Sequence, residues 1–126
     1  IIMQDTTGNQ IDMNKINSDK ILILFYASWC PHCKELIPQL VEYISNNRNN
    51  NLQVLAVSLD SNRNDWINFI KNNNMNWINV NSDKGWDCKT AKDYYIYATP
   101  TIFLVDKDKK IIGKPITIKE LKKELQ

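Results

Sequence analysis

The stretch FYASWCPHC, residues 25–33, decides the fold of this chain. It begins inside the continuous apolar run Ile21–Tyr26, which is typical of a strand buried on both faces, as in a parallel sheet. From Cys30 to about Asn47, apolar residues recur at helical spacing. A buried strand therefore leads through a short turn into a helix whose first turn contains both Cys30 and Cys33.

The two cysteines have different expected roles. The unpaired amides and positive end of a helix stabilise an anion, so we expect Cys30 to form a thiolate more readily than a free cysteine does. Cys30 comes first, and should be the more exposed nucleophile. Cys33 lies on the same helix face, from where its sulfur can resolve the mixed disulfide and release the substrate. This spacing predicts thiol-disulfide exchange by a dithiol cycle.

The dipeptide between the cysteines should tune their reduction potential. Pro31 suits the first helical turn, where its missing amide would have had no partner. His32 can add positive charge or donate a hydrogen bond near the Cys30 sulfur. Because both favour the thiolate and so the reduced form, we expect a potential above that of a Gly-Pro pair.

A C-x-x-C pair is also half of a zinc site. The chain lacks a second C-x-x-C or C-x-x-H, and only an unusual fold would combine His32 and Cys88 with the pair. We therefore expect no metal and no organic cofactor. Cys88 is interpreted as a small apolar filler, with a third redox group or a regulatory thiol as alternatives.

The rest of the chain predicts further α/β elements. Residues 1–4 and 10–13 flank a turn-rich segment, which favours an opening hairpin. Pro38 should bend the first helix because it removes a backbone donor. Next along the chain we expect a buried strand Leu52–Leu59 ending at Asp60, a helix around residues 66–70 and a short strand Trp77–Val80. A helix from Asp87 towards Tyr94 should follow, and then a hairpin of Thr101–Val105 with Lys110–Ile112. Thr117 and Glu120 fit a capping box for the last helix. We expect one domain spanning residues 1–126.

Composition argues against several classes of protein. The 126 residues suit a single hydrophobic core, and a net charge of +2 argues against a nucleic-acid-binding surface. The longest apolar run, Ile21–Ala27, is far shorter than the roughly 20 residues that span a bilayer. The chain begins at Ile1 without methionine, so we expect that an N-terminal piece, such as a signal peptide or lipid anchor, has been removed.

Taken together, these motifs resemble the thioredoxin superfamily, and more closely its TlpA and ResA-like branch of bacterial extracytoplasmic thiol-disulfide oxidoreductases. The resemblance is carried by the opening hairpin, Trp29-Cys30-x-x-Cys33 with Pro38 five residues beyond, Val57–Asp60 and Tyr97–Asp106. It implies a thioredoxin-like α/β fold, with a central mixed β-sheet flanked by helices and an N-terminal β-hairpin. It also implies protein or peptide disulfide and thiol substrates, a redox partner protein, and a location in the bacterial periplasm or tethered to the membrane facing it. We expect a monomer.

The resemblance also implies a substrate site. In such proteins the proline matching Pro100 is cis and faces the cysteines, and the preceding residue, here Thr99, offers backbone groups to an extended peptide. Trp29 is expected to bind substrate beside them. Leu24 and Leu36 stand where thioredoxin has a buried aspartate and ResA-like proteins often have a glutamate. The proton acceptor for the second cysteine is thus unassigned, and neighbouring Glu35 is a weak candidate.

Several functions stay open. The resemblance favours a reductase or interchange role, but the Pro-His dipeptide looks like that of DsbA, the periplasmic oxidant. The large helical insertion of the DsbA family has no room in this chain. A non-catalytic binding or chaperone-like module on the same fold is the hypothesis from another class. A thiol peroxidase ranks lower, because Ala27 replaces the threonine that peroxiredoxins carry three residues before their reactive cysteine.

Overall fold

The computed structural model describes residues 2–47, 51–81, 89–94 and 98–125. Its strands form one mixed sheet in the order β2-β1-β5-β4-β3-β6-β7. The strands are β1 (Ile2–Asp5), β2 (Gln10–Asp12), β3 (Lys20–Tyr26), β4 (Leu52–Ser58), β5 (Ile78–Asn81), β6 (Thr101–Asp106) and β7 (Ile111–Gly113). The helices are α1 (Pro31–Asn46), α2 (Arg63–Asn72), α3 (Lys89–Asp93) and α4 (Ile118–Leu125), with a short 3-10 helix at Met13–Lys15.

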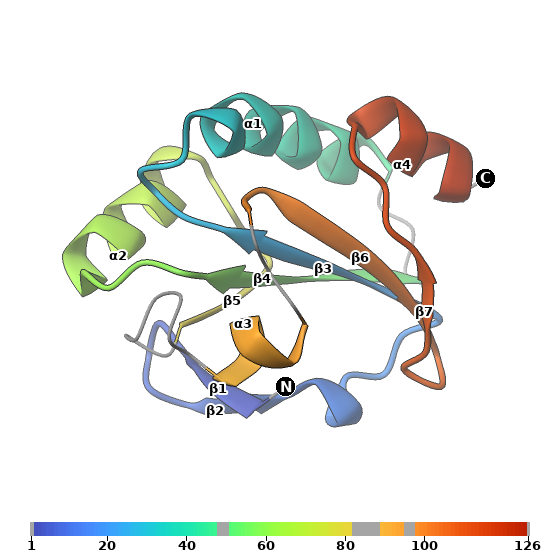
Figure 1. Cartoon of the computed structure of the whole chain (residues 1–126), viewed down its shortest axis with the longest axis horizontal. Helices are drawn as coiled ribbons and strands as arrows, with labels where there is room; N and C mark the ends of the chain where they lie inside the picture. Colours follow the sequence, from blue (N-terminus) through green and yellow to red (C-terminus); the bar gives the residue numbers. More distant parts are fainter. Residues whose placement is uncertain (1, 48–50, 82–88, 95–97, 126) are drawn as a thin grey trace.

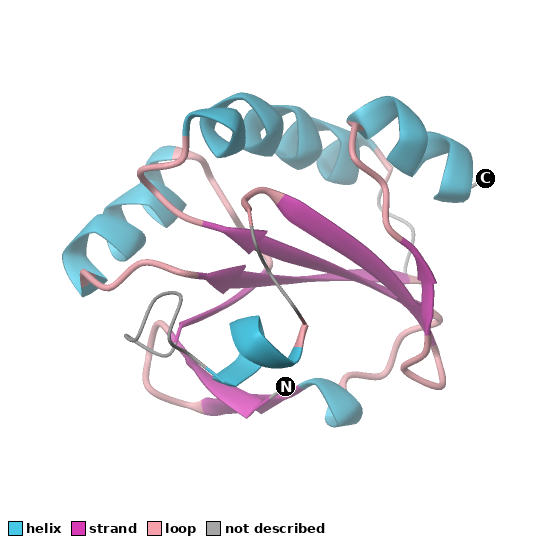
Figure 2. Ribbon diagram, viewed as in Figure 1, coloured by secondary structure: helices cyan, strands magenta, loops and turns pink. Residues whose placement is uncertain are grey.

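The helices cover both faces of the sheet (Figure 1, Figure 2). On one face, α1, α2 and α4 pack on alternate residues of β3, among them Leu22 and Leu24. On the other, α3 and the 3-10 helix pack on Ile21 and Ile23. Side chains alternate between the faces of a strand, so the continuous apolar run Ile21–Tyr26 supplies both cores. This arrangement confirms the predicted α/β fold with a central mixed sheet.

β3 lies inside the sheet, between β4 and β6. It pairs in parallel with β4, where Tyr26 lies opposite Ser58, and antiparallel with β6, where Phe25 lies opposite Thr101. The Leu59 amide continues the parallel ladder by donating to the Tyr26 carbonyl at 2.8 Å. The end of β3, from which the cysteine turn departs, is therefore fixed by both neighbouring strands.

The remaining predicted elements lie close to their expected positions. The opening hairpin pairs Met3 with Ile11, and β1 also joins β5. α1 continues through Pro38. The predicted helix near Tyr94 is present as α3, whereas Asp87 and Cys88, with the roles predicted for them, lie outside the described residues, as does Tyr97 of the motif that carries the resemblance.

The capping box at α4 is confirmed with one difference. The Glu120 amide donates to Thr117 Oγ1 at 3.1 Å, as predicted. The Glu120 carboxylate, however, accepts from the amide of Ile116 at 2.7 Å, one residue before the cap. Since Pro115 beside it is buried, the segment that leads into α4 is held at several points.

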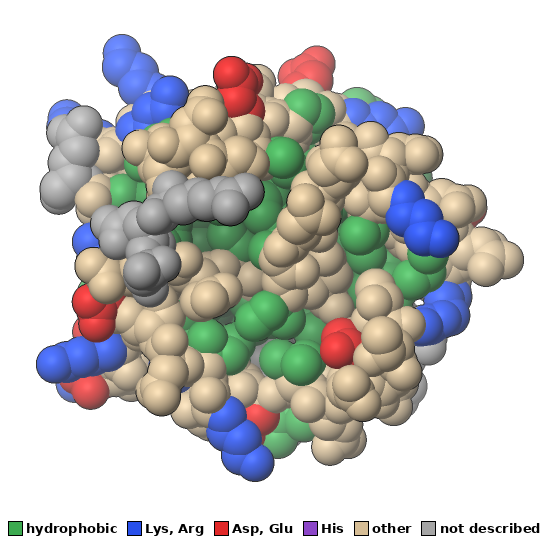
Figure 3. Space-filling model, turned by 180° about the vertical axis from the view of Figure 1, so that it is seen from behind, with side chains coloured by type: hydrophobic (Ala, Val, Ile, Leu, Met, Phe, Trp, Pro, Cys, Tyr) green, Lys and Arg blue, Asp and Glu red, His purple; other side chains and the backbone are tan. Residues whose placement is uncertain are grey.

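The surface carries charges of both signs. On the face turned away in Figure 1, acidic and basic side chains lie mostly around the rim, with hydrophobic side chains nearer the centre (Figure 3). Within the described ranges, no helix has the length and apolar character needed to cross a bilayer.

Candidate active site

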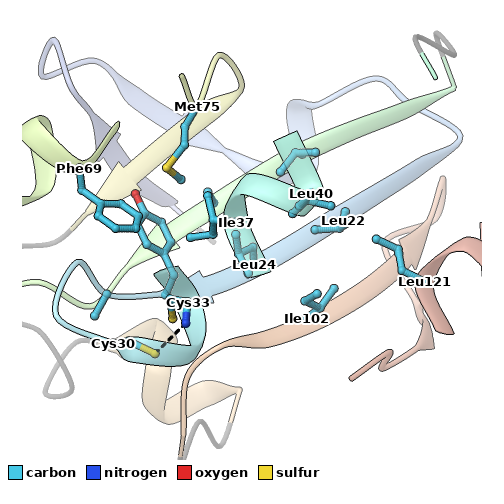
Figure 4. Close-up of a cluster of buried hydrophobic side chains, with 14 of the residues drawn as sticks. Leu22, Leu24, Cys30, Cys33, Ile37, Leu40, Phe69, Met75, Ile102 and Leu121 are labelled. Atoms are coloured by element: carbon cyan, nitrogen blue, oxygen red, sulfur yellow. Dashed lines mark hydrogen bonds between the residues drawn. The ribbon is translucent and has the colours of Figure 1, made fainter. Parts of the chain in front are cut away.

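Cys30 is the N-cap of α1. The prediction placed both cysteines in the first helical turn, but the helix begins at Pro31 and Cys30 has extended dihedral angles, φ −82° and ψ 118°. Its Sγ accepts a hydrogen bond from the amide of Cys33 at 3.2 Å (Figure 4). An N-cap side chain commonly satisfies an unpaired amide in this way, with an oxygen as acceptor. Here a sulfur takes that place at the positive end of the helix.

A second contact joins Cys30 to a distant segment. Its thiol donates to the carbonyl oxygen of Thr99 at 3.3 Å. The peptide bond between Thr99 and Pro100 is cis, as the resemblance implied. A carbonyl can only accept, so this contact needs the protonated sulfur, whereas the Cys33 amide also stabilises the thiolate. The sulfur thus lies between a group that favours the thiol and one that favours the anion.

Both sulfurs are free thiols at the edge of the core. Cys30 is 3% exposed and Cys33 is fully buried, so the expected order of exposure holds, although both sulfurs are buried. The Cys30 sulfur also contacts the Thr99 carbonyl, so a segment distant in sequence packs against it. Burial, and then contact with Cys30, raises the pKa of Cys33 to about 12. Cys33 is therefore a thiol at neutral pH.

A buried carboxylate holds the turn that carries Cys30. Asp60 is 2% exposed, and its two oxygens accept from the Ser28 amide at 3.0 and 3.1 Å. The hydroxyls of Ser28 and Ser58 each donate to it at 2.7 Å. Asn81 donates to the Asp60 carbonyl at 2.9 Å. Among the described acidic residues, Asp60 alone is buried.

This support was missed by the sequence reasoning, which quoted Val57–Asp60 as a motif without giving Asp60 a role. The signal was its position directly after a buried strand. The carboxyl ends of neighbouring parallel strands meet at one edge of a sheet, so a polar side chain following β4 lies beside the turn that follows β3. The hydrogen bonds from Ser28 to Asp60 show that the two residues are in contact.

The other predicted site residues surround the buried sulfur. His32, Thr99 and Pro100 line one groove of about 480 Å³, together with Leu36. Trp29 is 55% exposed, and does not line this groove.

Neither the candidate base nor a metal cluster is found beside Cys33. Glu35 is exposed and lines the groove, so α1 places it on the solvent side and Cys33 in the core. Leu24, at the position of the thioredoxin aspartate, is fully buried. Over the part of the chain that the structure describes, no group of three or more His, Cys, Asp or Glu residues is arranged to hold a metal ion.

Sequence comparison finds similarity to thioredoxin-like proteins and to thiol-disulfide oxidoreductases. A family model described as thioredoxin-like matches residues 17–111. Sporulation thiol-disulfide oxidoreductase A of Bacillus subtilis is 31% identical over 129 residues, covering 96% of this chain and 74% of that protein. Thiol-disulfide oxidoreductase ResA of Bacillus cereus is 26% identical over 115 residues, covering 91% of this chain but only 65% of the relative.

Solved structures agree with the sequence comparison. A thiol-disulfide oxidoreductase from Bacteroides fragilis superposes with a TM-score of 0.91 at 27% identity, covering 99% of this chain and 93% of that one. The chain therefore belongs to the thioredoxin-like family.

Proposed function

We propose that this chain exchanges disulfides with protein or peptide substrates through Cys30 and Cys33. The observation that carries the proposal is the position of the Cys30 sulfur, which contacts both the Cys33 amide at the start of α1 and the Thr99 carbonyl of the cis-proline segment. Names of relatives from two Bacillus species support the same chemistry.

The first step forms a mixed disulfide. The Cys30 thiolate attacks one sulfur of the substrate disulfide, so that an S–S bond forms to Cys30 while the substrate S–S bond breaks. The departing substrate sulfur leaves as a thiolate, and takes up a proton from solvent. An incoming peptide amide that donates to the Thr99 carbonyl would compete with the Cys30 thiol for that oxygen, and so favour the thiolate.

The second step releases the substrate. Cys33 attacks the Cys30 sulfur, an S–S bond forms between the two cysteines, and the second substrate sulfur leaves. Because the raised pKa keeps Cys33 protonated, its proton has to be transferred as the bond forms, and the leaving substrate thiolate accepts it. Two electrons have passed from the protein dithiol to the substrate. A dithiol partner protein has to reduce the new disulfide before another cycle.

We propose a reductase or interchange direction, in an extracytoplasmic location. The wider resemblance to ResA-like proteins supports this direction, and the Pro31-His32 dipeptide supports a DsbA-like oxidant as the alternative. Equilibration in glutathione buffers, followed by thiol trapping, decides between them. A potential near about −270 mV supports a reductase, and one near about −120 mV supports an oxidant. If the dipeptide raises the potential as proposed, changing Pro31→Gly with His32→Pro lowers it.

Trapping of the mixed disulfide tests the chemistry itself. A Cys33→Ser variant should accumulate a covalent adduct with a peptide disulfide at Cys30, visible by mass spectrometry, because nothing resolves it. A Cys30→Ser variant should form no adduct at Cys33, which is buried and protonated. Full biological activity of Cys30→Ser would instead favour the non-catalytic binding module.

A further inference from the structure

A groove between α1 and α4 begins beside the cis-proline segment. The two helices lie next to each other on the same face of the sheet (Figure 1). Three cavities of about 280, 480 and 520 Å³ lie along the groove, and each is lined by Gln39 and Ile118. Because they share these residues, the cavities adjoin one another and form a groove from Pro100 to Asn47.

The end of this groove near the cysteines has an apolar wall of Leu36, Pro100, Ile116 and Ile118. Polar residues, among them His32 and Glu35, line the same end. Ile116 is 77% exposed, although its backbone is tied down by the hydrogen bond to Glu120. A large apolar side chain held in solvent by a rigid backbone loses little conformational freedom on binding. This end therefore suits an apolar side chain of a partner.

The far end of the groove is basic. Lys119, Lys122 and Lys123 line it, and the Lys122 ammonium lies over the Tyr43 ring, 5.4 Å from its centroid. On the α1 side Glu42 is the acidic residue that lines this end. Three lysines and one glutamate leave the far end positive, which complements an acidic segment.

We propose that the groove binds the polypeptide flanking the substrate disulfide, and selects an apolar residue near the cysteine with acidic residues farther along. This inference rests on the proposed function, because it names the substrates on which that function acts. The acidic residues would contact Lys119 and Lys123, while Ile116 and Leu36 contact the apolar side chain.

Matched peptides test this selection. Each peptide contains one cysteine joined by a disulfide to mercaptoethanol, with leucine beside the cysteine and then three glutamates or three lysines, placed on either side in turn. Rates of exchange with the reduced protein are followed by acid quenching and chromatography. We expect the acidic peptide to react about 5-fold faster at low salt, and the ratio to approach one as salt rises, because exposed charge pairs are weak and screened.

Charge reversal in the groove provides the decisive variant. Lys119→Glu with Lys123→Glu should invert the preference, so that the lysine peptide reacts faster. Lys107→Glu with Lys110→Glu is the matched control, because it changes the net charge equally in the exposed turn between β6 and β7. The control should keep the wild-type preference. Comparing the ratio of two peptides within each variant cancels any change in thiol reactivity.

Three results would overturn the inference. The first is equal exchange rates for both peptides, and the second is a control variant whose rate ratio changes as much as that of the groove variant. The third is a concentration-dependent dimer that the Lys119 and Lys123 substitutions abolish, because it would assign the groove to a second copy of the chain. Hydroxyethyl disulfide separates this failure from failure of the proposed function. If the wild-type protein reduces that small disulfide but does not discriminate between peptides, only the inference fails; if it does not reduce it, the proposed function fails.

Discussion

Cys30 lies between a buried region and an exposed one that are built differently. Beneath it is the buried support, which we define as Ser28, Ser58, Asp60, Asn81 and Cys33. Its polar groups are linked by hydrogen bonds, and Asp60 is 2% exposed. Around it is the exposed rim, where Trp29 is 55% exposed and His32 is also open to solvent. From this comparison we expect the support to fix the sulfur in place and the rim to be the part that meets partners.

The largest effect should come from removing the carboxylate of the support. Asp60→Ala leaves the Ser28 amide and two hydroxyls without their acceptor in a buried site, so the free energy of unfolding should fall by about 3 kcal/mol. Urea denaturation measures this change in the free energy of unfolding. The exchange rate of the variant should fall as well, because the turn that presents Cys30 loses its anchor.

Two control variants show whether the loss of stability in Asp60→Ala arises because the carboxylate is buried. Asp108→Ala removes an exposed carboxylate in the turn between β6 and β7, and should change stability by less than about 0.5 kcal/mol. Asp60→Asn keeps one acceptor oxygen, so its free energy of unfolding should lie between those of wild type and Asp60→Ala. Equal stability of the two alanine variants would contradict the assignment of Asp60 to a structural support.

A smaller, pH-dependent effect should come from Cys33. The unfolded thiol ionises from about its ordinary pKa of 9.0, whereas the folded thiol stays protonated until about 12. The folded state therefore binds more protons between these values, and the free energy of unfolding of the reduced protein should fall as pH rises through this window. Below pH 9 the contribution of Cys33 is fully present.

Comparison with Cys33→Ala isolates the contribution of this thiol. Urea titrations at pH 7 to 10 under reducing conditions should show a steeper fall for wild type than for the variant. Burial also raises the pKa of Tyr26, so this residue lowers the free energy of unfolding of both proteins as pH rises. Parallel curves would show that Cys33 titrates normally.

The smallest effect on stability should come from the rim. Trp29→Ala should change the free energy of unfolding by less than about 0.5 kcal/mol, since the side chain is mostly exposed. It should still lower kcat/KM for a peptide disulfide by about 10-fold, as loss of a tryptophan contact does at interfaces. Ile2→Ala, another exposed apolar residue, should leave kcat/KM unchanged. A large loss of stability in Trp29→Ala would place Trp29 in the support.

The strands and helices were predictable where the pattern is local. The apolar run up to Tyr26 and the helical spacing after Cys30 predicted β3 and α1 correctly. Burial of a strand on both faces leaves a continuous apolar run, and burial of one helix face leaves a periodic pattern. The cis bond before Pro100 was expected only through the resemblance to a family. Periodicity alone contains no information about it.

The details of the site depend on contacts between distant residues. Cys30 contacts the Thr99 carbonyl, 69 positions away, and the Ser28 amide is held by Asp60, 32 positions away. The groove between α1 and α4 likewise joins segments from opposite halves of the chain. No local pattern indicates such pairs, so the sequence identified the candidate reactive residues but not the groups that contact or anchor them.

The strand order also constrains when the molecule can fold during synthesis. β3 is completed early in the chain, yet its antiparallel neighbour β6 begins only at Thr101. Until the ribosome has released that segment, a strand that is apolar from Ile21 to Tyr26 has an unpaired edge that can join other chains. Nascent chains that stop before residue 101 should therefore need a chaperone to stay dispersed.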